Sequence, residues 1–442
     1  MHIEQREKLA SLQRRLEHMP AEVINATEKN KLAVPYYVRA LALGIPAIFL
    51  GLQIAGWIGF VRIIADGHGD FRQLYIAGYM MRSGHAHELY EYSAQKRFQD
   101  ELISREQIAL PFNHLAHEAL LYAPFSVVRY QVGYCAFLVF NLAVLAFSYR
   151  LLRPYLSNLA QVYGWLPWVL LVTFLPVGIA LMQGQDSVIL FALLIGTFVA
   201  LHGRQDVKAG LCLGLGIFKF QIVIPIALLH LAWRRWQLSC GFAASSTACI
   251  LLSFAMVGAN QMKAFIRMLI SMSVRLSSAE QFTYGILPNY MPNLRGLVYG
   301  VGSASLSPRT LQLSTFVVSL ILFAMACWCG RHLQSTDAFL LGITASGLVS
   351  YHLLIHDLTI MIVPLFLVLD HCLFSEGKGQ NLFRTSALVL AAPILMAVSA
   401  AHFYLVAIPV SIFAVLLMHS GKSAQREQGS LLPRSLPLSF GS

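Results

Sequence analysis

Long apolar runs recur along nearly the whole chain, and they constrain its fold more than any other feature. Residues 40–64 and 311–330 are two examples. Each reaches the roughly 20 residues that an α-helix needs to cross a hydrocarbon core about 30 Å thick. Hydrophobic residues make up 57% of the chain and charged residues only 12%, whereas soluble domains devote about a quarter of their residues to charge. The sequence therefore predicts an all-α, polytopic transmembrane bundle, not a soluble domain on a single anchor.

The net charge of +11 is carried by basic residues that lie mostly between the apolar runs. They form no single stripe, so they indicate cytoplasmic turns under the positive-inside rule and not nucleic-acid binding. Most of the seven cysteines lie inside apolar segments, without a Cys-x-x-Cys pair. We interpret them as small core residues and not as metal ligands or disulfides.

The N-terminal residues 1–38 contain no short apolar stretch followed by a cleavage site, so they do not resemble a secretory signal. They are interpreted as a cytoplasmic amphipathic segment that lies on anionic headgroups. The first span, 39–64, then carries the loop 65–131 to the opposite side of the membrane. Later turns that contain Lys or Arg fit the cytoplasm, and turns without them fit the outside. Both termini are therefore expected in the cytoplasm, with a disordered tail at 420–442.

Residues 39–419 form the predicted transmembrane domain, with about twelve membrane helices and a second external loop at 259–310. Segments 209–218 and 222–233 are too short for simple spans, so we expect a broken helical hairpin with Lys219 and Gln221 at its bend. Irregular backbone at this depth is tolerated only where it is buried in protein or lines a wet cavity. Residues 112–128 form either a re-entrant or interfacial helix or a further span, which would invert every later side. The other expected spans are 132–151, 165–182, 187–201, 239–257, 311–330, 338–350, 358–373, 385–400 and 403–418.

Polar side chains gather at the predicted external ends of the apolar segments. Asp70 follows the first span, where its carboxylate is either a solvated loop acid or a group that deprotonates a hydroxyl or stabilises a cationic sugar. Gln185 and Asp186 separate two apolar runs. Lys219 lies in an apolar setting, where an unpaired charge is costly. It contacts a phosphate, pairs with Asp186, or snorkels to the membrane surface.

Two histidine motifs lie on the same predicted face. His352 and His356 are spaced i, i+4 at the outer end of an apolar helix, with Asp357 adjacent. That spacing can hold zinc, but the His-Glu-x-x-His pattern is missing and no third ligand is evident. A base or a substrate contact is favoured, and no metal or cofactor is predicted. His114 and Glu118 are also four apart and share a helix face, which is typical of an interfacial polar patch.

Six short motifs occur in a fixed order along the chain. They are Asp70-Phe71-x3-Tyr75 with Gly84-x5-Tyr90, Pro111-Phe112-Asn113-His114-x3-Glu118 with Pro124, Gly184-Gln185-Asp186-Ser187, Lys219-Phe220-Gln221, Met291-Pro292-Asn293-Leu294-Arg295-Gly296 and Tyr351-His352-x3-His356-Asp357. From about residue 66 to about residue 368, the chain resembles the polyprenol-phosphate-mannose-dependent mannosyltransferases of the GT-C glycosyltransferase superfamily. It departs from them at Leu115-Ala116-His117, where many relatives have a Pro-Pro pair.

The resemblance implies a GT-C fold and transfer of a hexose, with mannose the expected sugar. The donor would be a polyprenyl-phosphate sugar, and the acceptor a lipid or glycan on the extracytoplasmic face of a bacterial-type inner membrane. Membrane lipids are the other expected partners, and nucleic acid is not. Asp70 and His356 are the candidate catalytic residues. The candidate substrate-binding residues are Tyr75, His114, Glu118, Gln185, Asp186, Lys219, Gln221, Asn293, Arg295, His352 and Asp357.

The predicted reaction needs three groups at one place. Lys219 or Arg295 would contact the departing phosphate, Asp70 or His356 would accept the proton, and a groove would hold the lipid. Asp70, Lys219 and His356 are therefore expected to line one cavity. No Asp-x-Asp occurs in the chain, so inversion without a metal is expected. The alternatives are a transporter or flippase, which predicts inverted repeats that we do not find, and a ligase or polymerase that uses diphosphate carriers.

Overall fold

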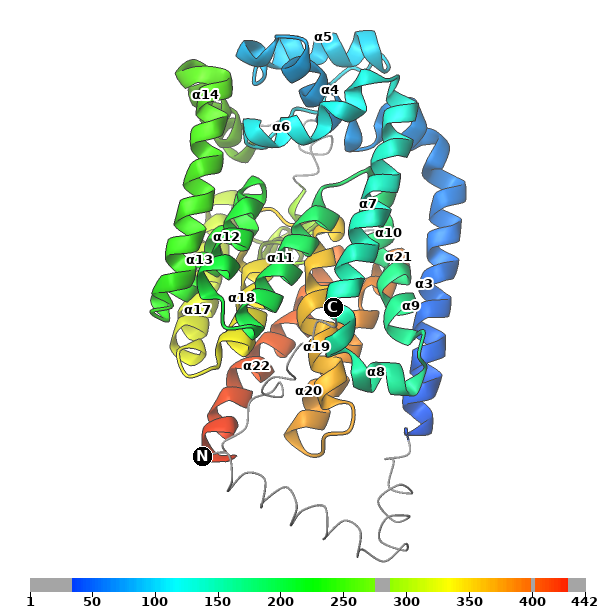
Figure 1. The fold of residues 1–442 in the computed structure, drawn as a ribbon, viewed down its shortest axis with the longest axis vertical. Helices are drawn as coiled ribbons and strands as arrows, with labels where there is room; N and C mark the ends of the chain where they lie inside the picture. Colours follow the sequence, from blue (N-terminus) through cyan, green and yellow to red (C-terminus); the bar gives the residue numbers. More distant parts are fainter. Residues whose placement is uncertain (1–33, 275–286, 399–401, 428–442) are drawn as a thin grey trace, which may run out of the picture. The chain divides into compact units, whose positions relative to one another are not determined.

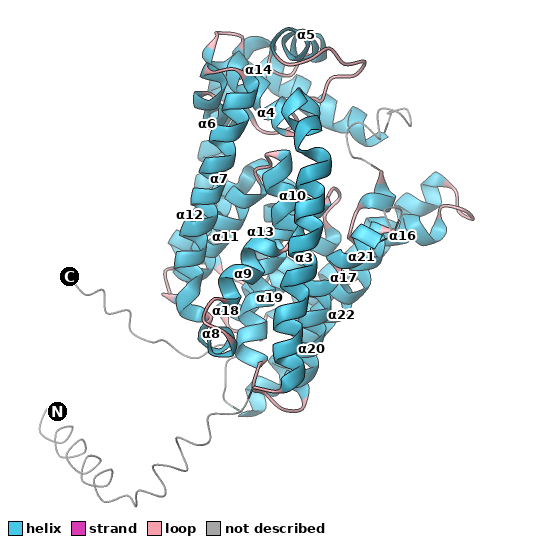
Figure 2. Ribbon diagram, turned by 90° about the vertical axis from the view of Figure 1, so that its right-hand side faces the viewer, coloured by secondary structure: helices cyan, strands magenta, loops and turns pink. Residues whose placement is uncertain are grey.

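A computed structural model describes residues 34–274, 287–398 and 402–427. The predictions for 1–33 and for 428–442 lie outside the described residues. The chain divides into two units, Met1–Leu43 and Gly44–Ser442. The described part of the first unit begins helix α3 (Tyr36–Ile63), and everything below concerns the second unit. Within the described ranges every regular element is a helix, so the all-α prediction is confirmed (Figures 1 and 2).

The apolar segments fold as helices where the sequence predicts them. Among the described residues, six helical segments are long and apolar enough to cross a membrane, a bent pair makes a seventh, and three more are apolar but shorter. Each of the twelve predicted segments contains a helix. Besides α3, these helices are α7 (Tyr130–Leu152), α9 (Leu166–Thr173), α10 (Leu175–Gln183), α11 (Ser187–His202), α12 (Asp206–Leu215), α13 (Phe220–Ala232), α14 (Trp236–Val274), α17 (Pro308–Gly330), α18 (Ser335–Val349), α19 (Ile362–Cys372), α20 (Lys378–Ala391), α21 (Pro393–Val398) and α22 (Ala407–Glu427).

Outer and inner helices differ in how much apolar surface they expose. Leu313 and Phe316 of α17 are each 63% exposed, and Ile58 of α3 is 78% exposed. Such a belt is costly in water but suits contact with lipid. By contrast, α18 and α19 are buried on nearly all sides, as expected for helices at the centre of a bundle. The architecture is therefore that of a membrane protein with a protein-enclosed core.

The segment Asp206–Ala232 doubles back on itself. Helix α12 lies directly on α14, because a Cβ on Gly210 would stand 2.0 Å from the Leu238 carbonyl oxygen and one on Gly241 would stand 2.2 Å from that of Val207. Helix α13 ends at Ala232, just before α14 begins at Trp236. Both ends of Asp206–Ala232 therefore lie at the start of α14. As a straight helix, this segment would measure about 40 Å, so its two ends could not meet there. The predicted hairpin is present, with the 3₁₀ turn Gly216–Lys219 at its tip.

The basic turns lie at one end of the bundle. The ring of Tyr155 contacts that of His202 with centroids 4.9 Å apart, which joins the turn after α7 to the turn after α11. Arg235 donates a hydrogen bond to the Leu333 carbonyl, which joins the turns before α14 and α18. Since Gly210 packs on Leu238, the start of α12 lies there too. The sequence thus places its Lys and Arg turns together, as the positive-inside rule requires.

The opposite end is covered by the segment 65–131, which forms a layer of short helices (Figure 1). They are α4 (Phe71–Arg82), α5 (Tyr92–Leu102) and α6 (Ala116–Tyr122). The uncertain stretch 112–128 does not form a span, because α6 has seven residues and continues into a 3₁₀ turn at Pro124–Val127. The loop before α6 is held by a hydrogen bond from the Tyr90 hydroxyl to the His114 carbonyl. The stretch 112–128 therefore adds no span to the bundle.

Two predicted boundaries differ from the structure. Helix α14 kinks at Gly258, which has φ +77°, but continues to Val274, so the loop expected from 259 begins later. Glycine accepts this φ without the steric cost of a Cβ, which lets the helix bend and resume. At the other end, α22 extends to Glu427. The tail expected to be disordered from 420 is helical up to that residue.

Candidate active site

A cavity of about 320 Å³ lies where the predicted motifs meet. Asp70 reaches it from the start of α4, Lys219 from the tip of the hairpin, and His356 from the 3₁₀ helix η7 (Ile355–Met361). The expected convergence of these three residues is thus present. The other candidate residues that line the cavity are His114, Gln185, Gln221, His352 and Asp357.

Lys219 is held between two buried carboxylates. Its Nζ lies 2.8 Å from Asp186 Oδ1 and 2.9 Å from Asp357 Oδ1. Asp357 also accepts hydrogen bonds from the Ser187 hydroxyl and from the Leu354 backbone N–H. Burying these charges is tolerable because they are paired and hydrogen-bonded. The pairing with Asp186 that the sequence left open is therefore present, and two of the three ammonium N–H groups are occupied.

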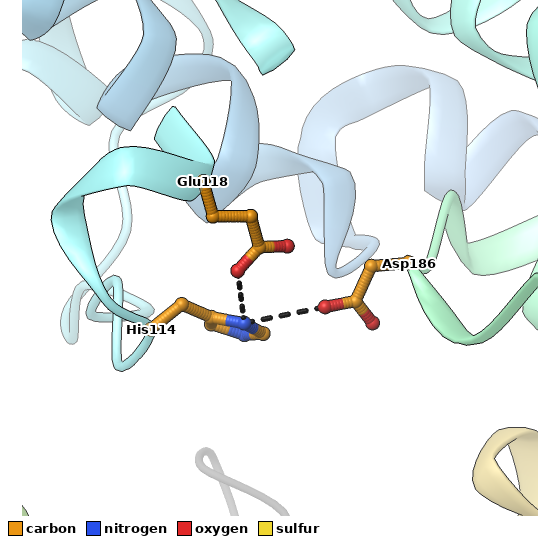
Figure 3. A group of neighbouring side chains, drawn as sticks. All are labelled: His114, Glu118 and Asp186. Atoms are coloured by element: carbon orange, nitrogen blue, oxygen red, sulfur yellow. Dashed lines mark ion pairs between the residues drawn. The ribbon is translucent and has the colours of Figure 1, made fainter. Parts of the chain in front are cut away.

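His114, Glu118 and Asp186 form a second buried cluster (Figure 3). His114 Nδ1 lies 2.7 Å from Glu118 Oε2 and 3.2 Å from Asp186 Oδ2. Burial alone would lower the pKa of His114, but the two carboxylates raise it to about 10. Burial raises the pKa of Glu118 to about 7, although His114 opposes that rise. The predicted polar patch at 114–118 is thus a buried charge cluster that adjoins the Lys219 ion pairs.

Asp70 differs from the other acids of the site. It stands at the N-cap of α4, yet its side chain caps no backbone N–H of that helix. Instead, its Oδ2 accepts a hydrogen bond from Gln185 Nε2 at 2.5 Å. The carboxylates that line the cavity are Asp70 and Asp357. Asp357 is neutralised by Lys219, whereas within the described ranges Asp70 has no ion-pair partner.

The two later histidines do not share a helix face, so the i, i+4 prediction for one apolar helix is wrong. Helix α18 ends at Val349, His352 lies in the following loop, and His356 lies in η7. Burial lowers the pKa of His352 to about 4, and the Asp357 charge only partly offsets this. The Nδ1 of His356 lies 3.1 Å from Gln183 Oε1. Its Nε2 lies 3.7 Å from Asp357 Oδ2, so both ring nitrogens of His356 face polar groups of the site.

Asn293 and Arg295 support the site from behind its wall. Asn293 caps α16 (Leu294–Gly302) by accepting a hydrogen bond from the Gly296 backbone, and its amide donates to the Ser350 carbonyl. Arg295 donates to the Tyr351 carbonyl and lies 3.9 Å from the centroid of that ring. Neither side chain lines the cavity. Both hold the loop that presents Tyr351, which does line it.

Tyr75 is also outside the cavity lining, as are Glu118 and Asp186. The Tyr75 phenol donates a hydrogen bond to the Val128 carbonyl at 2.7 Å, and its ring packs edge-on against Tyr130. These contacts fix α4 against the turn that precedes α7.

The sequence analysis missed three polar residues that line the cavity, namely Gln73, Asn113 and Tyr351. Asn113 and Tyr351 lie inside two of the six sequence motifs, so their position in those motifs could have predicted that they line the cavity.

One part of the cavity wall is apolar. Leu269 and Ile270 of α14 contribute to it, together with Leu110 and the two phenylalanines that flank Lys219, Phe218 and Phe220. The polar groups of the site therefore face a surface that suits hydrocarbon.

The comparisons with known proteins give one match. A family model described as glycosyltransferase family 87 matches residues 117–355. No curated protein and no solved structure matches significantly. The matched region spans more than half of the chain and includes Glu118, Asp186, Lys219 and His352. It agrees with a membrane glycosyltransferase of GT-C type, which acts on a sugar donor and an acceptor. The chain therefore belongs to glycosyltransferase family 87.

Proposed function

We propose that this protein transfers a hexose, with mannose favoured, from a polyprenyl-phosphate sugar to a hydroxyl of a lipid or glycan acceptor. One observation carries the proposal. Asp70 is a cavity-lining carboxylate that is oriented by Gln185 and is not neutralised by any described cation. A general base needs a carboxylate with a free lone pair at the reaction centre. The other cavity-lining carboxylate, Asp357, is committed to Lys219.

The proposed step is a single displacement at the anomeric carbon. The acceptor oxygen attacks that carbon while its proton passes to Asp70, and the bond to the phosphate oxygen breaks with the electron pair going to the phosphate. Attack opposite the leaving group inverts the anomeric centre. Polyprenyl phosphate leaves as an anion, so no further reactant is needed. Holding the reacting groups in this geometry supplies much of the rate enhancement.

We assign the phosphate contact to Lys219, since it lines the cavity and Arg295 does not. Two of its N–H groups face Asp186 and Asp357, and the third is left for a phosphate oxygen. The apolar wall that contains Leu269 and Ile270 would receive the first isoprene units of the donor. His356 is the alternative base, because its imidazole lines the same cavity as Asp70.

We further propose that the site faces the extracytoplasmic side of a bacterial-type inner membrane, with both termini in the cytoplasm. The support is the clustering of the basic turns at the end of the bundle opposite the layer 65–131. A polyprenyl carrier presents its sugar at that membrane surface.

The test is turnover of radiolabelled polyprenyl-phosphate-mannose by purified protein in lipid nanodiscs. Asp70→Asn keeps the side-chain shape but removes the charge, so we expect a loss of roughly 100- to 10,000-fold with normal yield of folded protein. Asp66→Asn, four residues earlier, exposed and outside the cavity lining, is the matched control and should retain activity. If Asp70→Asn is fully active, His356 is assigned as the base instead. If His356→Ala is also fully active, the proposed site is wrong. If the protein uses a diphosphate-linked donor and not the monophosphate-linked one, the ligase or polymerase alternative is correct.

A further inference from the structure

The cluster of His114, Glu118 and Asp186 brings three metal-ligand atoms together. His114 Nδ1, one oxygen of Glu118 and one oxygen of Asp186 all lie within 4.8 Å of one another. Figure 3 shows both carboxyl groups directed at the same imidazole nitrogen. The ligands come from two segments: His114 lies in the loop before α6 and Glu118 in the first turn of α6, whereas Asp186 lies in the turn before α11. The geometry points to a binding site for a divalent transition-metal ion, for which Mn²⁺ and Zn²⁺ are suitable probes.

The polar atoms at the centre of this cluster are buried and lack hydrogen bonds. Each of the three residues is more than nine-tenths buried. Within the described part of the chain, His114 Nδ1, Glu118 Oε2 and Asp186 Oδ2 make no regular hydrogen bond, and the close contacts among them are the two ion pairs of His114. One imidazole nitrogen carries at most one hydrogen, which cannot point at two carboxylates at once. Two carboxylate oxygens that share at most one hydrogen in a protein interior are stabilised when a cation lies between them.

The distances suit ligands that bind one ion side by side. Bonds from such an ion to imidazole nitrogen and carboxylate oxygen measure about 2.0–2.2 Å. Two ligands at right angles would then lie about 3.0 Å apart. The separations from His114 Nδ1 are 2.7 Å to Glu118 and 3.2 Å to Asp186. A set of one imidazole and two carboxylates suits Mn²⁺ or Zn²⁺.

Each carboxylate is held from outside by its second oxygen. The Tyr122 hydroxyl donates a hydrogen bond of 2.8 Å to Glu118 Oε1, and Lys219 Nζ lies 2.8 Å from Asp186 Oδ1. Outer partners of this kind orient metal ligands and leave one oxygen of each for the ion. The site also has an entry path, because His114 lines the cavity.

The local charge favours a divalent cation. The carboxylates of Asp186 and Asp357 pair with the ammonium of Lys219, and that of Glu118 lies against His114, which leaves two negative charges if His114 is neutral. A divalent ion would balance them. Protons on both His114 and Glu118 would balance them equally, and this is the competing outcome. If the proposed transfer reaction holds, the ion would also add positive charge near the departing phosphate.

The test is metal binding by the full-length protein in detergent, which does not depend on transfer activity. After removal of metal with a chelator, we expect one Mn²⁺ per chain in a titration followed by electron paramagnetic resonance. Echo modulation from one imidazole nitrogen should identify His114. Tyr122→Phe, which keeps the packing, should weaken binding roughly 10- to 100-fold. Glu118→Gln should weaken it further, and Asp66→Asn should leave it unchanged.

If folded wild-type protein does not bind one Mn²⁺ per chain, the inference is wrong, and the charge of the cluster is balanced by protons on His114 and Glu118. Binding that lacks a nitrogen signal, or that is unchanged in both Tyr122→Phe and Glu118→Gln, would overturn it as well. The wild-type titration and its nitrogen signal decide the matter even if a variant fails to fold. A protein that binds metal but does not turn over polyprenyl-phosphate-mannose would contradict the proposed function alone.

Discussion

The amide of Gln185 donates a hydrogen bond to the carboxylate of Asp70, which lies 115 positions earlier in the chain. This contact joins the layer above the bundle to the turn between α10 and α11. We expect Gln185→Ala to lower kcat by about 10- to 100-fold with a smaller change in KM, since a hydrogen bond to a charged group contributes about 1.5–3 kcal/mol. Steady-state kinetics would check this. Gln161→Ala, an exposed glutamine at the opposite end, is the control, and an unaltered kcat in Gln185→Ala would mean that Asp70 needs no such orientation.

Lys219 balances Asp186 and Asp357 in the protein interior. Lys219→Met would leave Asp357 buried without its ammonium counterion and Asp186 paired with His114 alone, and we expect a loss of about 3–5 kcal/mol in the free energy of unfolding. Thermal unfolding in detergent would report it as a lower midpoint. Lys208→Met, on an exposed position of α12, should have little effect. Equal midpoints for the two variants would show that the ion pairs are not structural.

His352 should remain neutral in mildly acidic solution, because burial lowers its pKa to about 4. The unfolded chain binds a proton near pH 6.5, so it holds more protons than the folded protein between about pH 6.5 and pH 4. The contribution of His352 to stability is therefore present above pH 6.5 and lost as the pH falls toward 4. Unfolding midpoints from pH 7 to pH 4 should fall less in His352→Gln than in wild type. Parallel curves would place His352 in a solvated setting.

The proposed orientation is testable by labelling single cysteines with a membrane-impermeant reagent in a background without the seven native cysteines. We choose two exposed positions, His87 in the layer 65–131 and Lys208 at the basic end. His87→Cys should react from outside the cell, and Lys208→Cys only after the membrane is opened. Labelling of both from the same side would refute the topology.

Much of the fold was predictable because it depends on local properties of the sequence. The length of an apolar run decides whether a helix crosses lipid, and charge decides which end of it stays in the cytoplasm, so the helices and the clustering of basic turns follow directly. The hairpin at Lys219 was predictable too, since both arms are short. The end of α14 could not be predicted from the sequence, because Gly258 bends that helix without ending it.

The site was predictable as a set of residues but not as a set of contacts. Motif order indicated that Asp70, Lys219 and His356 converge, yet it could not show that Lys219 is shared by two carboxylates. The same spacing of four placed His114 and Glu118 together but separated His352 and His356 into a loop and a 3₁₀ helix. Such differences depend on where α18 ends and which side chains reach across the bundle. These are tertiary properties that no single segment encodes.

The sharing of Lys219 also bears on how the protein is assembled during synthesis. Asp186 has already been made when the hairpin leaves the ribosome, so the lysine can enter the membrane as half of a neutral pair. Asp357 follows 138 residues later. It then meets an ammonium that is already fixed at the tip of a hairpin whose first arm, α12, packs on α14 backbone to backbone at Gly210 and Gly241. The positive charge thereby serves as a docking point at which the later half of the chain joins the earlier one.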